Sequence, residues 1–362
     1  MGRKREGNKD NEFKVKPRSR VKRFFKYIFS FALIGTLITV PTLMYVENFI
    51  YKISQSSINS NPIRTSKDEE ITNQLDITLE ENATDLQISY NNKYYTYLKD
   101  SKLYINSLET GETIHVIEEE YPICYYNLLY DKNMIMYFVE YEGRYASTLT
   151  LNTYEIDTER QAEYNSFTVY NFSKIKDMSM SPIVNMIYIN VETKTQYSTN
   201  NIIYKIDLFN NMNQVKSGLI IDKMYMLQHK DKIYYEDTRY NIYSGGYYTL
   251  NLFKEDVTMI GLDEDDNLYF LTEEPKNKVY VVKDNEIVNT ITLSDSDIVD
   301  TYTNYQGVYL IYPTYILKVS GNDPYKRIGK LSKYVTFEAV KDNTMYLRTK
   351  DNKLITTELL KN

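Results

Sequence analysis

The chain has 362 residues, with 43 basic and 49 acidic side chains, 38 tyrosines, two histidines, one cysteine and no tryptophan. Its hydrophobic content of 42% can form a sizeable core, which excludes wholesale disorder. The single Cys124 excludes an internal disulfide, and two histidines exclude a histidine-rich metal centre.

The amino-terminal segment differs in charge from the rest of the chain. Residues 1–26 hold eleven basic and three acidic side chains, whereas the residues after 46 hold 32 basic and 46 acidic ones. We interpret residues 1–26 as a basic cytoplasmic tail that contacts anionic lipid headgroups, at ~1 kcal/mol for each basic residue near the surface. The tail has no base-reading motif, so nucleic acid is not expected as a partner.

Residues 27–46 contain no charged side chain. A helix of this length spans roughly 30 Å, the thickness of the hydrocarbon core of a bilayer. The run lacks an A-x-A-like cleavage site, which favours an uncleaved signal anchor over a cleaved signal peptide or a buried helix. We therefore predict one transmembrane helix, with the amino terminus in the cytoplasm and the carboxyl-terminal part outside the cell membrane.

Residues 47–74 are rich in Ser, Asn, Gln and charged residues and have no sustained apolar period. They are predicted to be a flexible linker, which would hold the next domain ~30 Å from the membrane. Residues 75–362 have short runs of Tyr, Ile, Val, Leu and Thr between polar turns, which is typical of an all-β domain.

A short motif recurs through this domain: Asn or Asp, any residue, a bulky apolar residue, then Tyr. There are five close copies and two looser ones, at Asn92–Tyr95, Asn185–Tyr188, Asp231–Tyr234, Asp266–Tyr269, Asn343–Tyr346, Asn133–Tyr137 and Gln306–Tyr309. Successive tyrosines of the motif lie 42, 51, 46, 35, 40 and 37 residues apart. This period of about 42 residues is typical of the four-stranded blades of a β-propeller, so we predict seven blades.

Each motif opens the second strand of a blade, and a third strand follows it. The third strands are expected at Leu103–Ile105, Tyr154–Asp157, Ile203–Asp207, Tyr248–Leu250, Val279–Val282, Ile316–Val319 and Leu354–Ile355. The seventh unit lacks a fourth strand, while Leu75–Glu80 reads as a strand with no unit of its own. We predict that this amino-terminal strand pairs with the last blade and closes the ring. No sheet edge between the two chain ends is then left unpaired.

Leu103–Glu112 and Ile203–Leu208 carry a family resemblance. They resemble the third strand and following turn of the bacterial membrane-anchored YWTD/YVTN-like and DUF5050-like β-propellers. The resemblance implies a propeller and an extracytoplasmic binding role, and it carries over no catalytic residue. The absence of tryptophan departs from the YWTD pattern.

The familiar catalytic and nucleotide-binding motifs are missing, including the P-loop, G-x-G-x-x-G, H-E-x-x-H, G-x-S-x-G and C-x-x-C. Ser173 and Lys176 match S-x-x-K without its partner motifs, and Cys124 has no basic neighbour in sequence that would activate it. The acidic run at 263–267, with Glu274, has a calcium-like spacing, but a strand begins where a calcium loop needs glycine. We interpret this run as a hairpin turn and predict no catalytic residue, cofactor or metal.

Loop lengths suggest a binding surface. From the motif tyrosine to the third strand there are 9, 17, 16, 14, 11, 7 and 9 residues, so blades two to four are expected to carry the longest loops between their second and third strands. Tyrosine and arginine, which are enriched at interface hot spots, occur in these loops. The candidate partner-binding residues are Tyr141, Arg144, Tyr145, Tyr197, Arg239, Tyr240 and Tyr243.

These observations lead to a functional hypothesis. The chain is expected to be a non-enzymatic, single-pass membrane protein whose propeller binds or scaffolds an extracytoplasmic protein or cell-wall partner. Its Tyr-, Lys-, Asn- and Ile-rich composition suits the envelope of a Gram-positive bacterium. The alternative is an envelope polysaccharide hydrolase or lyase, which would need acidic and basic side chains from several inner strands to converge in the propeller funnel.

Overall fold

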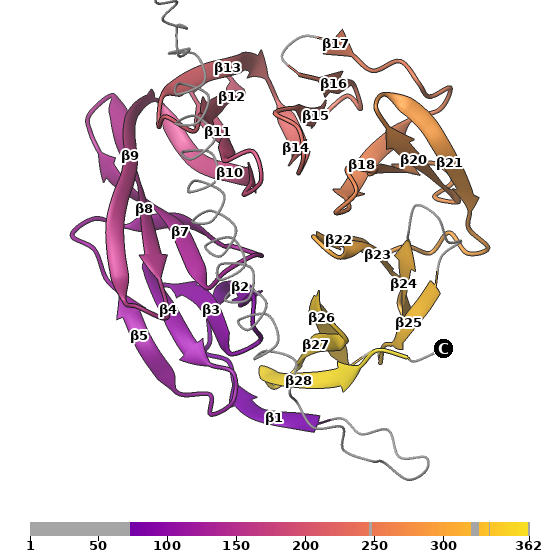
Figure 1. The fold of residues 1–362 in the computed structure, drawn as a ribbon, viewed down its shortest axis with the longest axis horizontal. Coiled ribbons are helices and arrows are strands. Elements are labelled where there is room, and N and C mark those ends of the chain that lie inside the picture. Colours follow the sequence, from indigo (N-terminus) through magenta and orange to yellow (C-terminus); the bar gives the residue numbers. More distant parts are fainter. Residues whose placement is uncertain (1–72, 246–247, 320–325, 333, 361–362) are drawn as a thin grey trace, which may run out of the picture. The chain divides into compact units, whose positions relative to one another are not determined.

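The computed structural model describes residues 73–245, 248–319, 326–332 and 334–360. These residues form seven four-stranded antiparallel sheets, numbered here as blades 1 to 7, arranged around a common axis (Figure 1). The described part of the chain is therefore an all-β, seven-bladed β-propeller, as the sequence predicted. The predicted tail and transmembrane helix lie outside the described residues, as does the linker apart from residues 73 and 74. None of the described residues forms a helix with the length and apolar character that crossing a bilayer requires.

Within each blade the strands follow one another from the axis to the rim. Blades 1 to 3 consist of β2 (Thr84–Ile88), β3 (Tyr94–Lys99), β4 (Lys102–Ser107) and β5 (Thr113–Ile117); β6 (Ile123–Leu128), β7 (Met134–Glu142), β8 (Ala146–Glu155) and β9 (Arg160–Tyr170); and β10 (Phe172–Ser181), β11 (Met186–Lys194), β12 (Thr199–Ile206) and β13 (Met212–Leu219). Blades 4 and 5 consist of β14 (Ile221–Met226), β15 (Ile233–Asp237), β16 (Ile242–Ser244) and β17 (Tyr248–Thr249); and β18 (Val257–Leu262), β19 (Leu268–Thr272), β20 (Lys278–Lys283) and β21 (Glu286–Thr292). Blades 6 and 7 consist of β22 (Asp300–Asn304), β23 (Gly307–Ile311), β24 (Tyr315–Val319) and β25 (Lys326–Lys330); and β26 (Val335–Lys341), β27 (Thr344–Thr349), β28 (Lys353–Glu358) and β1 (Asn73–Thr78).

The recurring motif marks the start of the second strand in every blade. Its tyrosine is buried in all seven copies, with an exposed fraction of at most 5%. The motif's Asn or Asp lies in the turn that precedes this strand, and Asn92, Asn185 and Asp266 have positive φ angles of 55°, 52° and 63°. Asn and Asp tolerate this left-handed conformation better than other side chains with a Cβ. The motif therefore combines a turn former with a core side chain.

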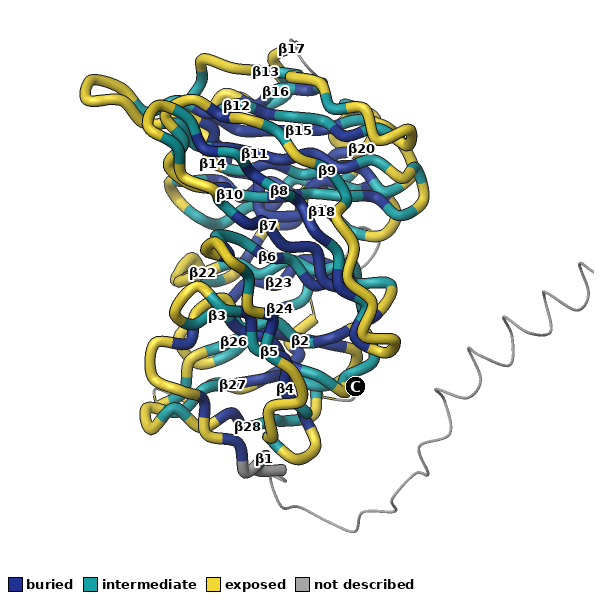
Figure 2. Tube along the Cα trace, turned by 90° about the vertical axis from the view of Figure 1, so that its left-hand side faces the viewer, coloured by how far each residue is buried: buried dark blue, intermediate teal, exposed yellow. Residues whose placement is uncertain are grey.

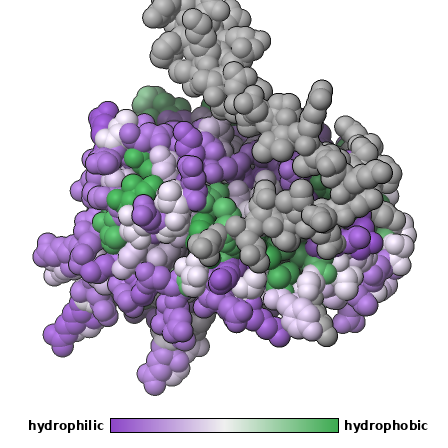
Figure 3. Space-filling model, turned by 90° about the horizontal axis from the view of Figure 1, so that it is seen from below, coloured by the Kyte–Doolittle hydropathy of each residue, from purple (hydrophilic) through white to green (hydrophobic). Residues whose placement is uncertain are grey.

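Hydrophobic clusters fill each of the seven interfaces between neighbouring blades. The second strands lie between two such clusters, and every residue of β15, β19 and β23 is buried. Burial on both faces explains why these strands are rich in aromatic and β-branched residues. Figure 2 shows buried residues along the strands and exposed residues in the turns. Seen from below, the surface is mostly hydrophilic, with small hydrophobic areas between (Figure 3).

The amino-terminal strand closes the ring, as predicted. β1 pairs antiparallel with β28, and Ile77 lies opposite Leu354. Leu79 N then donates to Asn352 O at 2.7 Å. Ile77, Leu79 and Leu354 are buried in the cluster that joins blade 7 to blade 1. β1 begins at Asn73, two residues before the predicted start.

Two predictions about loops and strands are wrong. The third strand of blade 4 is β16, and residues 248–249, expected there, form the fourth strand β17. Blades 2 and 3 have long strands in place of long loops, since their pairing continues to Glu142 opposite Ser147 and to Lys194 opposite Thr199. A continued ladder satisfies backbone hydrogen bonds that a long loop would leave to water. The extra residues therefore lengthen the hairpins of blades 2 and 3.

Candidate functional site

One face of the propeller combines the turns between second and third strands with the linkers between blades. Backbone hydrogen bonds join the two kinds of segment: Lys194 N donates to Asn171 O at 2.8 Å, and Thr238 N donates to Ile220 O at 3.0 Å. We call this end of the ring the linker face. The turns between first and second strands lie at the opposite end.

Six of the seven candidate binding residues are exposed on the linker face of blades 2 to 4. They are Tyr141 at the end of β7, Arg144 and Tyr145 in the β7–β8 turn, Tyr197 in the β11–β12 turn, and Arg239 and Tyr240 in the β15–β16 turn. Tyr145 is 69% exposed and Tyr197 is 89% exposed. The guanidinium carbon of Arg144 lies 5.2 Å from the centre of the Tyr145 ring, so the two side chains stack.

Tyr243 is the exception. It lies in β16, where its ring stacks on Tyr235 with 5.0 Å between ring centres. Its hydroxyl group donates to Asp237 Oδ2 at 3.1 Å. Since β16 directly follows a short turn, Tyr243 belongs to the packing of blade 4 and is not part of an exposed loop.

Three further exposed tyrosines lie in linkers on this face, and the candidate set, which came only from turns within blades, does not include them. Tyr334, before β26, lies away from blades 2 to 4, whereas the other two lie beside these blades. Tyr121 precedes β6 in the linker from blade 1, and Tyr170 ends β9 at the linker to blade 3. Tyr121 contacts Tyr141 edge to face, with ring centres 5.0 Å apart. Strand order alone places the linkers between blades at the same end of the ring as the turns between second and third strands, and this relationship could have identified these tyrosines. We define the tyrosine face as Tyr121, Tyr141, Tyr145, Tyr170, Tyr197 and Tyr240, which are six of the eight exposed tyrosines among the described residues.

Tyr240 has an unusual backbone. Its φ angle is 61°, in a turn where Asp237 Oδ1 accepts hydrogen bonds from the backbone of Arg239 and Asn241. The same five-residue turn occurs at 207–211 and at 263–267, where Asn210 and Asp266 hold the equivalent position with φ of 65° and 63°. A left-handed conformation costs an ordinary L-residue about 1–2 kcal/mol, and Asn and Asp adopt it more readily. A tyrosine at this position therefore does not serve the stability of the turn.

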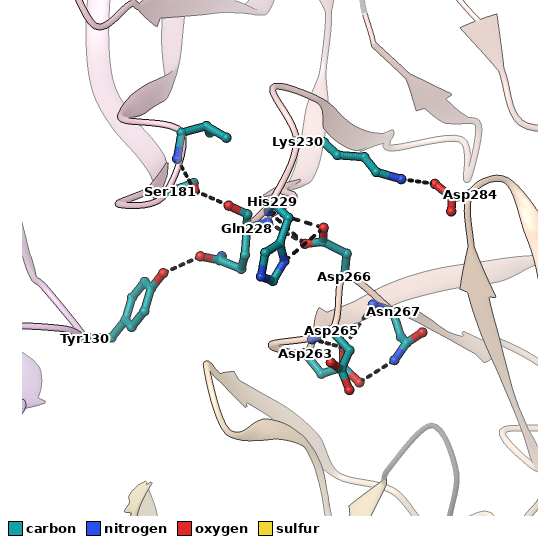
Figure 4. A network of polar contacts seen from close by, with 11 residues as sticks. Tyr130, Ser181, Gln228, His229, Lys230, Asp263, Asp265, Asp266, Asn267 and Asp284 are labelled. Carbon is teal, nitrogen blue, oxygen red and sulfur yellow. Dashed lines mark hydrogen bonds and ion pairs between the residues drawn. The ribbon is translucent and has the colours of Figure 1, made fainter. Parts of the chain in front are cut away.

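The acidic run at 263–267 is the hairpin turn that the sequence predicted. Asp263 Oδ1 accepts from Asp265 N at 3.0 Å and from Asn267 N at 2.9 Å, and its Oδ2 accepts from the Tyr269 hydroxyl at 2.8 Å. These bonds occupy the carboxylate within the turn. Figure 4 shows the neighbouring contacts, in which Asp266 accepts from the backbone of Gln228 and His229 and so joins blade 5 to blade 4.

Neither Ser173 nor Cys124 is arranged as an activated nucleophile. Ser173 donates to Glu192 Oε1 at 3.1 Å, whereas the Lys176 ammonium group donates to Ile221 O at 2.6 Å. Burial, with the nearby charge of Glu140, raises the pKa of the Cys124 thiol to about 12. A thiol with such a pKa stays protonated and is a poor nucleophile at neutral pH.

The inner strands enclose a cavity of about 370 Å³ near the end of the axis opposite the linker face. We call it the axial cavity. It is lined by Leu86, Gln87, Ile88, Asn127, Leu128, Leu129, Tyr130, Met178, Ser179, Met180, Gln228, Tyr302, Thr303, Asn304, Tyr305, Glu338, Ala339, Val340 and Lys341. Only Glu338 and Lys341 in this lining are charged, and both come from β26. Glu338 Oε1 is paired with Arg348 Nε at 2.7 Å.

Two carboxyl groups outside the cavity lining have perturbed pKa values. Burial raises the pKa of Asp177 on β10 to about 6 and that of Glu236 on β15 to about 7. Glu236 is 1% exposed, and its Oε2 accepts from Met259 N at 2.6 Å. The hydrogen bond from Met259 to Glu236 therefore links blade 5 to blade 4.

No family model and no curated protein matches the chain. A chain in the crystal structure of the mitotic checkpoint complex is similar in fold, with a TM-score of 0.50 and 8% identity, covering 83% of this chain and 99% of that one. Kluyveromyces lactis Hsv2 has a TM-score of 0.49 and 11% identity, covering 77% and 94%. Saccharomyces cerevisiae Sqt1 has a TM-score of 0.47 and 6% identity, covering 77% and 84%. At 8% identity, the likeness to the chain of the checkpoint complex shows the fold alone.

Proposed function

We propose that this chain is a single-pass membrane protein of the cell envelope whose propeller binds another protein outside the membrane through the tyrosine face. The observation that carries the proposal is the concentration of exposed tyrosines on consecutive turns and linkers of blades 2 to 4. Tyrosine provides a large, rigid contact area and a hydroxyl group at a low cost in conformational entropy, which is why it is enriched at hot spots. The long apolar run at 27–46 and the basic tail at 1–26 support the membrane assignment.

The arrangement of the face supports a protein partner. Its turns extend from hairpins with continuous backbone pairing, so the tyrosines are presented on a rigid support. The Arg144–Tyr145 stack and the Tyr121–Tyr141 contact hold three tyrosines of the face, and Arg144 beside them, in place before binding. Such preorganisation lowers the entropy that binding costs.

Tyr240 gives an independent reason to assign a role to this face. The two equivalent turns of the same chain hold Asn or Asp at its position, which suits the backbone better. Residues that carry backbone strain are found disproportionately at functional sites. The exposed ring of Tyr240 is therefore best explained by a contact that the isolated propeller does not make.

The lining of the axial cavity favours a scaffold over a polysaccharide hydrolase or lyase. Glycoside hydrolysis needs two carboxyl groups that face the same substrate. In the cavity lining the only carboxylate is Glu338, and it is paired with Arg348. We therefore assign the propeller a non-enzymatic role.

Site-specific photo-crosslinking in cells tests the proposal. A photoreactive phenylalanine at Tyr145 or Tyr197 of the full-length chain should form an adduct with one partner protein. The matched control is Phe209, which is 77% exposed in the β12–β13 turn at the opposite end of the ring. The partner is then purified, and its affinity should fall by at least about tenfold for Tyr197→Ala and stay unchanged for Phe209→Ala. Equal crosslinking from Tyr197 and Phe209, or a cell-wall polymer as the adduct, would reject the proposed protein site.

A further inference from the structure

Lys341 is a buried lysine on the innermost strand of blade 7. It ends β26, and 7% of its surface is exposed. Its ammonium nitrogen lies 4.8 Å from the ring centre of Tyr305 and 5.8 Å from that of Tyr90. Among the residues that the structure describes, no carboxylate pairs with it and no hydrogen-bond acceptor receives its protons. Two ring faces replace only part of the hydration that a buried ammonium group loses.

The neighbouring Asp342 favours the charged form of Lys341, yet burial has the larger effect and lowers the Lys341 pKa. The Asp342 oxygens are bonded to other blades. Asp342 Oδ2 accepts from Asn92 Nδ2 at 2.6 Å, and Oδ1 accepts from Gln306 Nε2 at 3.0 Å. These bonds tie blade 7 to blades 1 and 6. Lys341 forms no ion pair with Asp342, and its side chain lines the axial cavity.

Three other polar side chains of the cavity lining have N–H or O–H groups for which the described residues supply no acceptor. The side chain of Asn127 has no hydrogen-bond partner among the described residues, and the same holds for the amide nitrogen of Gln228. Ser179 Oγ accepts from Met226 N at 3.0 Å, which leaves its hydroxyl proton available to a ligand. The cavity lining thus combines the positive charge of Lys341 and several N–H and O–H groups with one carboxylate, Glu338, whose charge is paired with Arg348.

Much of the rest of the wall is apolar or aromatic, beside the polar side chains of Gln87, Thr303 and Asn304. Met178, Met180 and Val340 line the cavity, and Tyr130 stacks on Tyr305 with 5.4 Å between ring centres. The Tyr130 hydroxyl group donates to Gln228 Oε1, so blades 2, 4 and 6 meet at this end of the axis (Figure 4). The volume of about 370 Å³ lies within the range of small-molecule sites.

We propose that the axial cavity binds a small organic carboxylate, whose anionic group pairs with Lys341 and accepts from Asn127 and Gln228 while its apolar body packs against Met178 and Met180. The positive charge and the hydrogen-bond donors favour an anionic group on the ligand. The apolar side chains of the wall favour an organic body over a free inorganic anion. This site is separate from the tyrosine face and does not depend on the role proposed for it.

The test uses the full-length chain and benzoate as the probe, with benzyl alcohol as the neutral analogue and phenyl phosphate as the competing oxyanion. Affinity is measured by calorimetric titration. Benzoate should bind, benzyl alcohol should bind at least about tenfold more weakly, and Lys341→Met should weaken benzoate by a similar factor. Lys350→Met is the matched control, because Lys350 is exposed on the same blade, and it should leave the affinity unchanged.

Lys341→Met should fold, since methionine fills a similar volume and removes an unpaired buried charge. Its folding is checked by thermal unfolding, and Gln228→Leu provides a second variant that should also weaken benzoate. Failure of benzoate to bind, equal binding of benzyl alcohol, or an unchanged affinity in Lys341→Met would overturn the proposal. Tighter binding of phenyl phosphate than of benzoate would overturn the assignment to carboxylates.

Discussion

Ile77 lies opposite Leu354 across the pairing of β1 with β28, so the two ends of the domain are held together in one blade. Both side chains are buried, with exposed fractions of 3% and 0%. Replacing Ile77 with Ala should lower the free energy of unfolding by about 2–5 kcal/mol, because it leaves a cavity in the contact between blades 7 and 1. Ile287→Ala is the control: Ile287 is 39% exposed on the outer strand β21, so denaturant unfolding should show little loss. Equal stability of both variants would mean that β1 does not hold the ring closed.

Gly111, which contacts Ile77, and Gly218 on β13 of blade 3 form a pair that separates backbone strain from side-chain contact. Gly111 and Gly218 have φ angles of 73° and 81°, so alanine at either position pays for a left-handed backbone, about 1 kcal/mol. A Cβ at Gly111 would lie 3.2 Å from Ile77 Cγ1, whereas one at Gly218 meets nothing within 4 Å. Gly111→Ala should therefore be the less stable variant in thermal unfolding. If Gly218→Ala loses as much, Gly111 does not pack against β1 as described.

The strained turn of blade 4 predicts a substitution that improves folding and harms binding. Tyr240→Asn introduces the residue type that Asn210 provides at the equivalent position of the turn at 207–211. It should raise the free energy of unfolding by about 0.5–1 kcal/mol. The same variant should bind the partner more weakly, because it removes an exposed ring from the tyrosine face. Chemical denaturation and an affinity measurement on one preparation check both effects. Weaker binding together with lower stability would point to a misfolded turn and count against the assigned role.

Glu236 predicts a pH dependence of stability. Its pKa rises from the ordinary value of 4.5 to about 7 because the carboxyl group is buried. Between these values the folded chain binds more protons than the unfolded chain, so the contribution of Glu236 to stability falls as the pH rises from about 4.5 to about 7. Glu236→Gln should be more stable than the wild type at pH 8 and similar to it at pH 4. Glu286→Gln, an exposed control, should keep the wild-type profile.

The number of blades could be predicted because each blade repeats one local device. A turn residue such as Asn92 and a buried tyrosine such as Tyr95 must occur at a fixed spacing, so the period is visible in the sequence. The closing strand could be predicted because an unpaired sheet edge is unfavourable. Loop lengths could not be predicted. Extra residues between the motif tyrosine and the third strand can lengthen either the paired strands or the loop, and in blades 2 and 3 they lengthen the strands.

The candidate sites were only partly visible in the sequence. Tyr145 and Tyr197 were found because they occupy turns whose face follows from strand order. The axial cavity could not be found, since Lys341 reads as an ordinary charged residue at the end of a strand. Its burial results from Tyr305 and Tyr90, which lie on other blades. Only the arrangement of blades around the axis brings these groups together.

Hydrogen–deuterium exchange of the full-length chain, with and without the partner identified by crosslinking, tests the central claim most directly. Binding through the tyrosine face predicts slower exchange at residues 141–146, 170–172, 195–199 and 238–242, and no change in the turns at 207–211 and 263–267. Protection confined to those last two turns would place the partner at the opposite end of the ring and contradict the account.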